Sequence, residues 1–153
     1  MDLYFNIKVK LFKEVLGLVN EKIMSNQNAL NDLKESAESE AKSSAGDKHE
    51  TGRAMIHLEQ EKMTKQLVEN TKLQQVLTSI DPSFLHDKVE LGALVITDRL
   101  RFFVSVGLGK INSSGHDYYS ISLSSPIIKA FIGKKIDDLV HFNGQLYKII
   151  LIV

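Results

Sequence analysis

The sequence has no cysteine and no tryptophan among its 153 residues, and it has only two prolines. Without cysteine, disulfide frameworks, thiolate nucleophiles and cysteine-ligated zinc sites are all excluded. Neither sign of charge is in excess, because 19 Lys and Arg residues balance 19 Asp and Glu residues. Binding to nucleic acid would therefore need a local basic patch, since the chain offers no overall positive field.

Long apolar runs are missing as well. No stretch approaches the ~18 consecutive apolar residues that a bilayer-spanning helix needs, so we expect no membrane segment. Residues 1–12 carry Asp2, Lys8 and Lys10 among the apolar residues and lack a small-residue cleavage site, which argues against a signal peptide. The expected location is the cytoplasm.

The composition divides the chain into two halves. From Lys8 to Ile80 there is no proline, and good helix formers dominate. After Asp81-Pro82, β-branched and aromatic residues become common and alternate with polar ones. Because the residue before a proline resists continuing a helix, we place the boundary here. The prediction is an α+β protein with a helical domain at residues 1–80 and a β-rich domain at residues 81–153.

The first half predicts an antiparallel two-helix coiled-coil hairpin. Facing residues in such a hairpin have numbers with a nearly constant sum, and the apolar positions pair with sums of 91 to 93. The pairs are Ala37 with Met55, Leu33 with Leu58, Leu30 with Met63, Ile23 with Val68, Val19 with Leu73, and Val15 with Leu77. This pairing puts the tip within residues 43–51, where helix-forming residues are fewest. A dimerisation coil or a spacer is the alternative interpretation.

Two acidic residues at the predicted tip are the candidate functional groups. Asp47 and Glu50 are three positions apart, which is typical of a capping box that stabilises a helix start. The same spacing would also present two hard oxygen donors to a Mg²⁺ ion held mainly by another molecule. A second pair, Asp32 and Glu35, lies farther from the tip, where a row of surface charges is the simpler interpretation.

The second half predicts a small, mostly antiparallel sheet with one short helix that begins at Ser125-Pro126 and stops at Gly133. The expected strands cover residues 93–96, 101–106, 118–123, 139–142 and 146–153. Asn143-Gly144 predicts a type I′ hairpin, while residues 107–109 and 112–115 are expected as turn and loop. Aromatic residues near Arg99 and Arg101 suggest either a strand core, which is the commoner case, or stacking on nucleic acid.

Two separated motifs resemble the bacterial Gre transcript-cleavage factors. Ser125-Pro126-Ile127, followed by residues 131–135 and 137–140, is similar to the C-terminal signature of that family. The tip, Gly46-Asp47-x-x-Glu50-Thr51, resembles the family's Gly-Asp-x-x-Glu-Asn. The order of the halves, a helical hairpin before a β domain, agrees with the family as well.

The resemblance implies an accessory factor of RNA polymerase, not an enzyme in its own right. It implies an immunophilin-like β domain that docks near the secondary channel of the polymerase, and a hairpin that enters the channel. Asp47 and Glu50 would help to bind a Mg²⁺ ion for cleavage of backtracked RNA near its 3′ end. The polymerase and this protein would hold that ion jointly, and the isolated protein would not. No membrane contact and no sequence-specific DNA binding is implied.

The C-terminal signature implies the residues that bind the partner, which are Ser125, Pro126, Gly133, Lys134 and Asp138. At the tip, Thr51 stands where the family has Asn, and Gly52-Arg53 follows directly. Two alternatives therefore remain beside the cleavage factor. One is a regulator that binds the channel without stimulating cleavage, and the other is a coiled-coil interaction protein unrelated to transcription.

Overall fold

The computed structural model describes the backbone of residues 2–42 and 46–153, and the side chains of residues 2–41 and 51–153. The expected α+β class is confirmed, because two long helices precede a six-stranded sheet with one short helix. The chain forms two compact units: residues 17–74, and residues 1–16 together with residues 75–153. Among the described residues, no helix combines the length and apolar character needed to cross a lipid bilayer.

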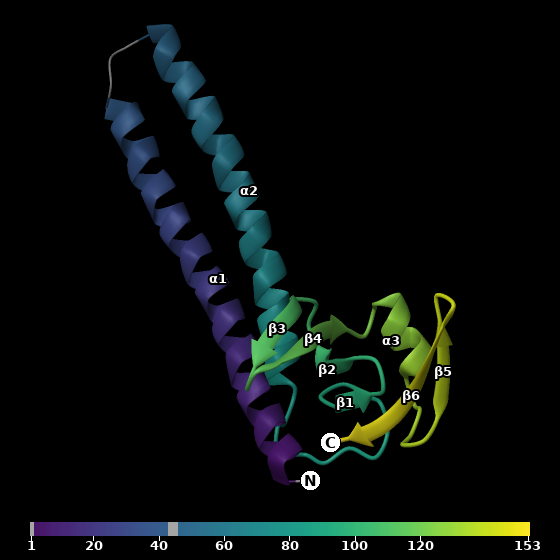
Figure 1. The fold of residues 1–153 in the computed structure, drawn as a ribbon. Helices are drawn as coiled ribbons and strands as arrows, with labels where there is room; N and C mark the ends of the chain where they lie inside the picture. Colours follow the sequence, from purple (N-terminus) through teal and green to yellow (C-terminus); the bar gives the residue numbers. More distant parts are fainter. Residues whose placement is uncertain (1, 43–45) are drawn as a thin grey trace. The chain divides into compact units, whose positions relative to one another are not determined.

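The two long helices are α1 (Asp2–Lys42) and α2 (Gly46–Thr78). Within the unit of residues 17–74 they run side by side (Figure 1). The Gln74 amide donates to Asn20 Oδ1 at 2.9 Å, and the Asn70 amide donates to Asn26 Oδ1 at 2.7 Å. From Asn20 to Asn26 along α1, the partner in α2 moves back from Gln74 to Asn70, so the predicted antiparallel pairing is observed in this unit.

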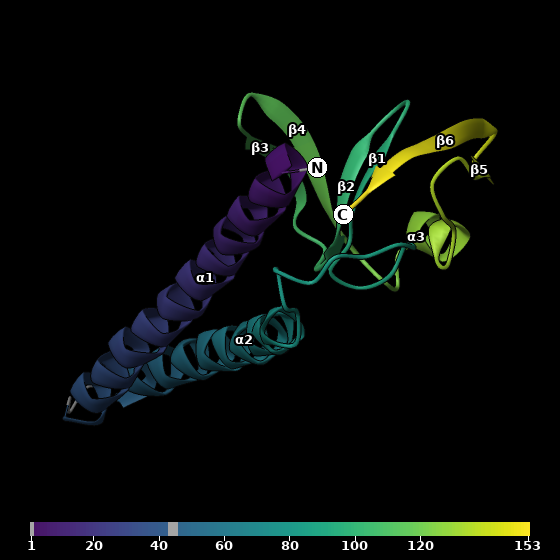
Figure 2. The same ribbon diagram turned by 90° about the horizontal axis from the view of Figure 1, so that it is seen from below.

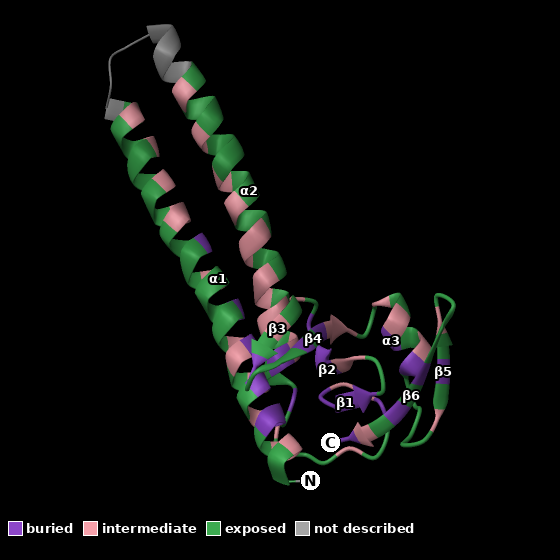
Figure 3. Cartoon of the chain, in the orientation of Figure 1, coloured by how far each residue is buried: buried purple, intermediate pink, exposed green. Residues whose placement is uncertain are grey.

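The face that α2 turns toward α1 differs from the prediction. Met55 and Leu58 are each 67% exposed, and Val68 is 50% exposed, so these three side chains do not belong to the seam. The half-buried positions recur instead at steps of three and four (Figure 3), and include Gly52, Ile56, Gln60, Met63, Leu67, Asn70 and Gln74. A constant sum of residue numbers fixes how far along the hairpin two paired residues lie. It does not fix which side of each helix faces the other, because adjacent residues on one helix give sums that differ by only one.

A polar layer interrupts this seam. Asn26 is only 6% exposed, and its amide donates to Gln66 Oε1 at 3.1 Å while its carbonyl accepts from Asn70 at 2.7 Å. Buried amide groups of this kind cost stability but fix the register of paired helices, because any shift leaves them without partners. The layer therefore determines which residues of α1 and α2 face one another.

The sheet has the strand order β3-β4-β2-β1-β6-β5. Its strands are β1 (Leu94–Thr97), β2 (Arg101–Ser105), β3 (Gly109–Ser113), β4 (His116–Ser122), β5 (Leu139–Phe142) and β6 (Gln145–Ile152). All neighbours are antiparallel except β2 and β4, which are parallel. The short helix α3 (Pro126–Phe131) follows β4 and lies beside the β5–β6 hairpin (Figure 1, Figure 2).

Two of the three hairpin turns of the sheet have two central residues with positive φ. Asn143 and Gly144, with φ of 50° and 74°, form the predicted type I′ turn between β5 and β6. Ser114 and Gly115, with φ of 53° and 79°, do the same between β3 and β4. The sequence predicted a loop at residues 112–115 and a turn at residues 107–109. Both predictions extended too far, because Gly109–Ser113 forms strand β3.

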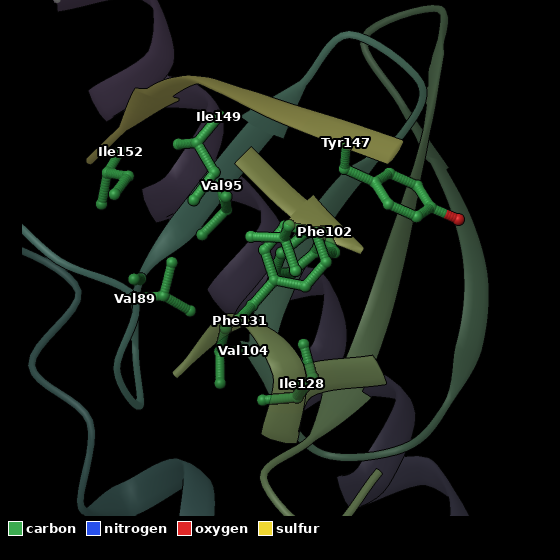
Figure 4. Packing of buried hydrophobic residues seen from close by; sticks show 11 residues of the cluster. Val89, Val95, Phe102, Val104, Ile128, Phe131, Tyr147, Ile149 and Ile152 are labelled. Atoms are coloured by element: carbon green, nitrogen blue, oxygen red, sulfur yellow. The ribbon is translucent and has the colours of Figure 1, made fainter. Parts of the chain in front are cut away.

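The core of the sheet unit is a cluster of apolar side chains between the sheet and α3 (Figure 4). Phe131 of α3 is at its centre, with its ring 5.0 Å from that of Phe102 and 5.6 Å from that of Tyr147, both in edge-on contacts. Phe102 and Phe103 are 0% and 1% exposed, so the strand-core interpretation of these two aromatics is confirmed. Aromatic pairs of this geometry add to the stability that apolar burial provides.

Candidate functional site

The predicted tip lies at the junction of the two long helices. α1 ends at Lys42 and α2 begins at Gly46, so Asp47 and Glu50 belong to the first turns of α2. Their side chains, like the whole of residues 43–45, lie outside the described residues. The start of α2 at Gly46 places both acids near the N-terminal end of this helix, where the helix dipole favours a negative charge.

The first described seam position after the tip is Gly52. A Cβ atom on Gly52 would lie 2.9 Å from Cδ and 3.0 Å from the carboxylate oxygens of Glu40 on α1. The missing side chain thus leaves room for the Glu40 carboxylate between the helices. This contact shows that α1 and α2 still face one another two positions beyond Glu50.

The part of the chain with described side chains provides no metal site of its own. Within it, no group of three His, Asp or Glu side chains is close enough together to hold an ion. Asp32 and Glu35 are both exposed on α1, as expected of surface charges. Asp47 and Glu50 lie outside that part of the chain, so the predicted Mg²⁺ site at the tip stays a prediction.

The second predicted region surrounds α3. Ser125 is the N-cap residue, and Pro126 is the first residue of the helix, where its missing N–H leaves no hydrogen bond unmade. Gly133 follows α3 with φ of 77°, and its N–H donates to the Val89 carbonyl at 2.9 Å. The Lys134 carbonyl accepts from the Val89 N–H at the same distance. These bonds tie the end of α3 to the segment before β1.

Asp138 stabilises the loop that leads into β5. Its Oδ2 accepts from the Lys135 N–H at 2.7 Å, and its carbonyl accepts from the Ile149 N–H at 3.0 Å. Gly133 and Asp138 therefore have structural roles that account for their presence. Pro126 and Lys134 are exposed, so they are available on the surface for contact with a partner.

A groove lies beside the β1–β2 turn, in the region where the sequence suggested either a strand core or stacking on nucleic acid. Its volume is about 730 Å³, and it is lined by Thr97, Asp98, Arg99, Leu100, Arg101, His116, Asp117, Tyr119, Gln145 and Tyr147. These residues come from three places in the chain: the β1–β2 turn, the first half of β4, and the start of β6. Only the proximity of Arg99 and Arg101 to aromatic residues was visible in the sequence.

A buried lysine is the second feature that sequence patterns did not reveal. Lys8, in the N-terminal part of α1, is 0% exposed, and its ammonium donates to the Phe84 carbonyl at 2.5 Å. Burial lowers the pKa of Lys8, and the nearby Asp81 carboxylate opposes that effect. The hydroxyl and amide of Ser83 donate to Asp81 Oδ1 at 2.6 and 2.9 Å, which lowers the pKa of that carboxyl.

Comparisons of the chain with protein-family models, with curated proteins and with solved structures found no match. The functional assignment therefore depends on the motifs and on the geometry of the described residues.

Proposed function

We propose that this chain is a Gre-like accessory factor of bacterial RNA polymerase. Its helical hairpin would enter the secondary channel, and its tip acids would promote cleavage of backtracked RNA by the polymerase. The observation that carries the proposal is the junction of α1 and α2 between Lys42 and Gly46. This junction supports placing Asp47 and Glu50 at the end of a two-helix hairpin, which is the position that the Gre resemblance implies for them.

The dimensions of the hairpin support this role. α2 has 33 residues and is therefore about 50 Å long at 1.5 Å per residue. Most residues of the hairpin are exposed, and its seam is narrow and partly polar. A narrow pair of helices suits a probe that has to fit within a confined channel, and the Asn26 layer would hold the two helices in register there.

Mg²⁺ is the cofactor that the proposal requires. Asp47 and Glu50 are hard oxygen donors, the ligand type that Mg²⁺ prefers, and two carboxylates leave the remaining positions to water and to the partner. Bound Mg²⁺ would supply Lewis-acid activation of a phosphodiester and of the attacking water. The contribution of this chain would be to deliver the two carboxylates and the N-terminal end of α2.

The sheet unit would anchor the protein at the channel entrance. We propose that it is immunophilin-like, in keeping with its six-stranded sheet and the short helix packed on it. The surface around α3, with exposed Pro126 and Lys134, would contact the polymerase. Ser125, Gly133 and Asp138 would act indirectly, since they shape the ends of α3 and the loop before β5.

The experiment uses bacterial RNA polymerase stalled in a backtracked complex with labelled RNA and Mg²⁺. The wild-type protein should co-purify with the polymerase and accelerate RNA shortening. Asp47→Asn with Glu50→Gln should abolish the acceleration. The matched control is Asp32→Asn with Glu35→Gln, which removes an equal charge from a pair of the same spacing on α1, and it should act like the wild type.

The non-cleaving regulator is the second candidate, and the Thr51-Gly52-Arg53 sequence after the tip acids favours it. It predicts that the wild-type protein binds the polymerase and competes with a cleavage factor, but leaves the RNA length unchanged. A chain that recovers no polymerase subunits from a cell lysate would contradict both candidates and leave the coiled-coil interaction protein.

A further inference from the structure

We propose that the groove beside the β1–β2 turn binds the sugar–phosphate backbone and a base of single-stranded nucleic acid. The inference depends on the sheet unit alone and does not require the proposed role at the polymerase. Its basis is that Arg99 and Arg101, neither of them ion-paired with a described carboxylate, and the partly exposed Tyr119 are lining residues of one groove.

The two arginines are held in place by contacts that leave their charge unneutralised. Arg99 Nε donates to the Leu146 carbonyl at 2.7 Å. The guanidinium carbon of Arg101 lies 5.8 Å from the centre of the Tyr118 ring. No carboxylate in the described part of the chain forms an ion pair with either arginine. Guanidinium groups fixed in this way bind phosphate oxygens with little loss of side-chain freedom.

The two aspartates of the groove are already engaged. Asp117 lies 3.9 Å from the Lys110 ammonium and accepts from the Asn112 amide at 3.1 Å. Asp98 accepts from the Lys148 N–H at 2.9 Å, which fixes the β1–β2 turn against β6. With Asp117 paired to Lys110, the two arginines exceed the remaining carboxylate of the groove, Asp98, by one positive charge.

Aromatic and hydrogen-bonding groups complete the groove. Tyr119 is 38% exposed, so part of its side chain is accessible to a base. Tyr147 packs its ring into the core while its hydroxyl points away from the other labelled side chains (Figure 4). Gln145 adds an exposed amide. Basic groups beside an exposed aromatic ring are the combination that binds single strands with little sequence preference.

The volume of about 730 Å³ falls within the range of roughly 300–1,000 Å³ for ligand clefts. It suits a short stretch of chain, not a duplex. An acidic protein segment is the competing occupant, because carboxylates also bind arginine. Such a segment would have no use for the Tyr119 ring, and this difference separates the two occupants experimentally.

The test is fluorescence anisotropy of labelled oligouridylate and oligothymidylate of about eight nucleotides, a length within the site sizes of single-strand binders. The full chain should bind one or both at low salt, and a preference for oligouridylate would indicate contact with the 2′-hydroxyl. Arg99→Gln with Arg101→Gln should weaken binding at least tenfold. The same change should reduce the slope of log affinity against log salt by about 1.4, since each phosphate contact contributes about 0.7.

The charge-matched control is Lys88→Gln with Lys129→Gln, two exposed lysines that do not line the groove. This control should retain the wild-type affinity. Tyr119→Leu should weaken binding roughly tenfold, whereas Tyr119→Phe, which keeps the ring, should not. Arg99→Gln alone serves as a second variant should the double variant unfold, because Arg99 is exposed.

The proposal is overturned if both double variants lose affinity equally, or if Tyr119→Leu leaves binding unchanged. It is also overturned if oligoglutamate binds through Arg99 while neither oligonucleotide binds. That last result would assign the groove to an acidic protein partner.

Discussion

At the scale of single residues, Lys8 shows what sequence patterns miss. It lies among apolar residues near the start of a helix, and nothing in its neighbourhood in the sequence distinguishes it from an exposed lysine. Its ammonium donates to the Phe84 carbonyl and is influenced by the Asp81 charge, and both residues are more than 70 positions away in the chain. Long-range packing of this kind has no periodicity from which it could be predicted.

The lowered pKa of Lys8 predicts a pH dependence of stability. Between the folded-state pKa and the unfolded value near 10.5, the unfolded chain binds more protons, so the free energy of unfolding rises with pH. Lys8→Met removes this rise, which amounts to about 1.4 kcal/mol for each unit of pKa depression. Urea unfolding of both proteins between pH 7 and pH 10 should show the wild type gaining stability relative to the variant. Parallel pH profiles would contradict the burial of a charged Lys8.

Gly133 is a position where backbone conformation determines the residue. Its φ is 77°, and a Cβ atom there would meet nothing within 4 Å, so the only penalty for a side chain is the left-handed conformation. Gly133→Ala should lower the free energy of unfolding by about 1–2 kcal/mol. Gly107→Ala is the matched control, because Gly107 lacks a positive φ and its Cβ would only touch Ser122 at 4.0 Å. Equal thermal shifts for the two variants would exclude this explanation.

At the scale of elements, the sequence predicts most helices and strands but not how they face one another. Asn143-Gly144 identified its hairpin because both residues readily adopt positive φ, whereas Ser114-Gly115 carries a weaker signal, so strand β3 was missed. Met55 and Leu58 were placed in the seam because they are apolar, yet Ile56 and Gln60 occupy it. In a narrow two-helix unit, geometry and polar pairing outweigh hydrophobicity at single positions.

The Asn26 layer provides the prediction at this scale. Asn26→Ala should lower the free energy of unfolding by about 1–3 kcal/mol, because it leaves the amides of Gln66 and Asn70 without their partner. Asn26→Leu with Asn70→Leu removes both members of the shorter hydrogen bond and should restore or exceed wild-type stability. Urea unfolding measures both variants. A double variant less stable than Asn26→Ala would show that the layer stabilises the hairpin as well as fixing its register.

At the scale of the whole molecule, the α+β class and the order of its halves follow from composition. The change at Asp81-Pro82 marks the end of α2 within a few residues, since α2 ends at Thr78. The sequence did not predict that residues 1–16 belong to the same compact unit as the sheet. That association depends on side chains such as Ile7 and Leu11, whose helical spacing fits a coiled coil equally well.

The proposed function requires that Asp47 and Glu50 contribute to RNA cleavage in the bound complex and not to binding of the polymerase. The most direct test measures two quantities for Asp47→Asn with Glu50→Gln: the affinity for backtracked RNA polymerase and the rate of RNA cleavage in that complex at saturating protein. We predict an affinity within about twofold of the wild type and a cleavage rate lower by at least about 100-fold, as expected when metal ligands are removed. A variant that cleaves at the wild-type rate once bound would contradict the proposed role of Asp47 and Glu50.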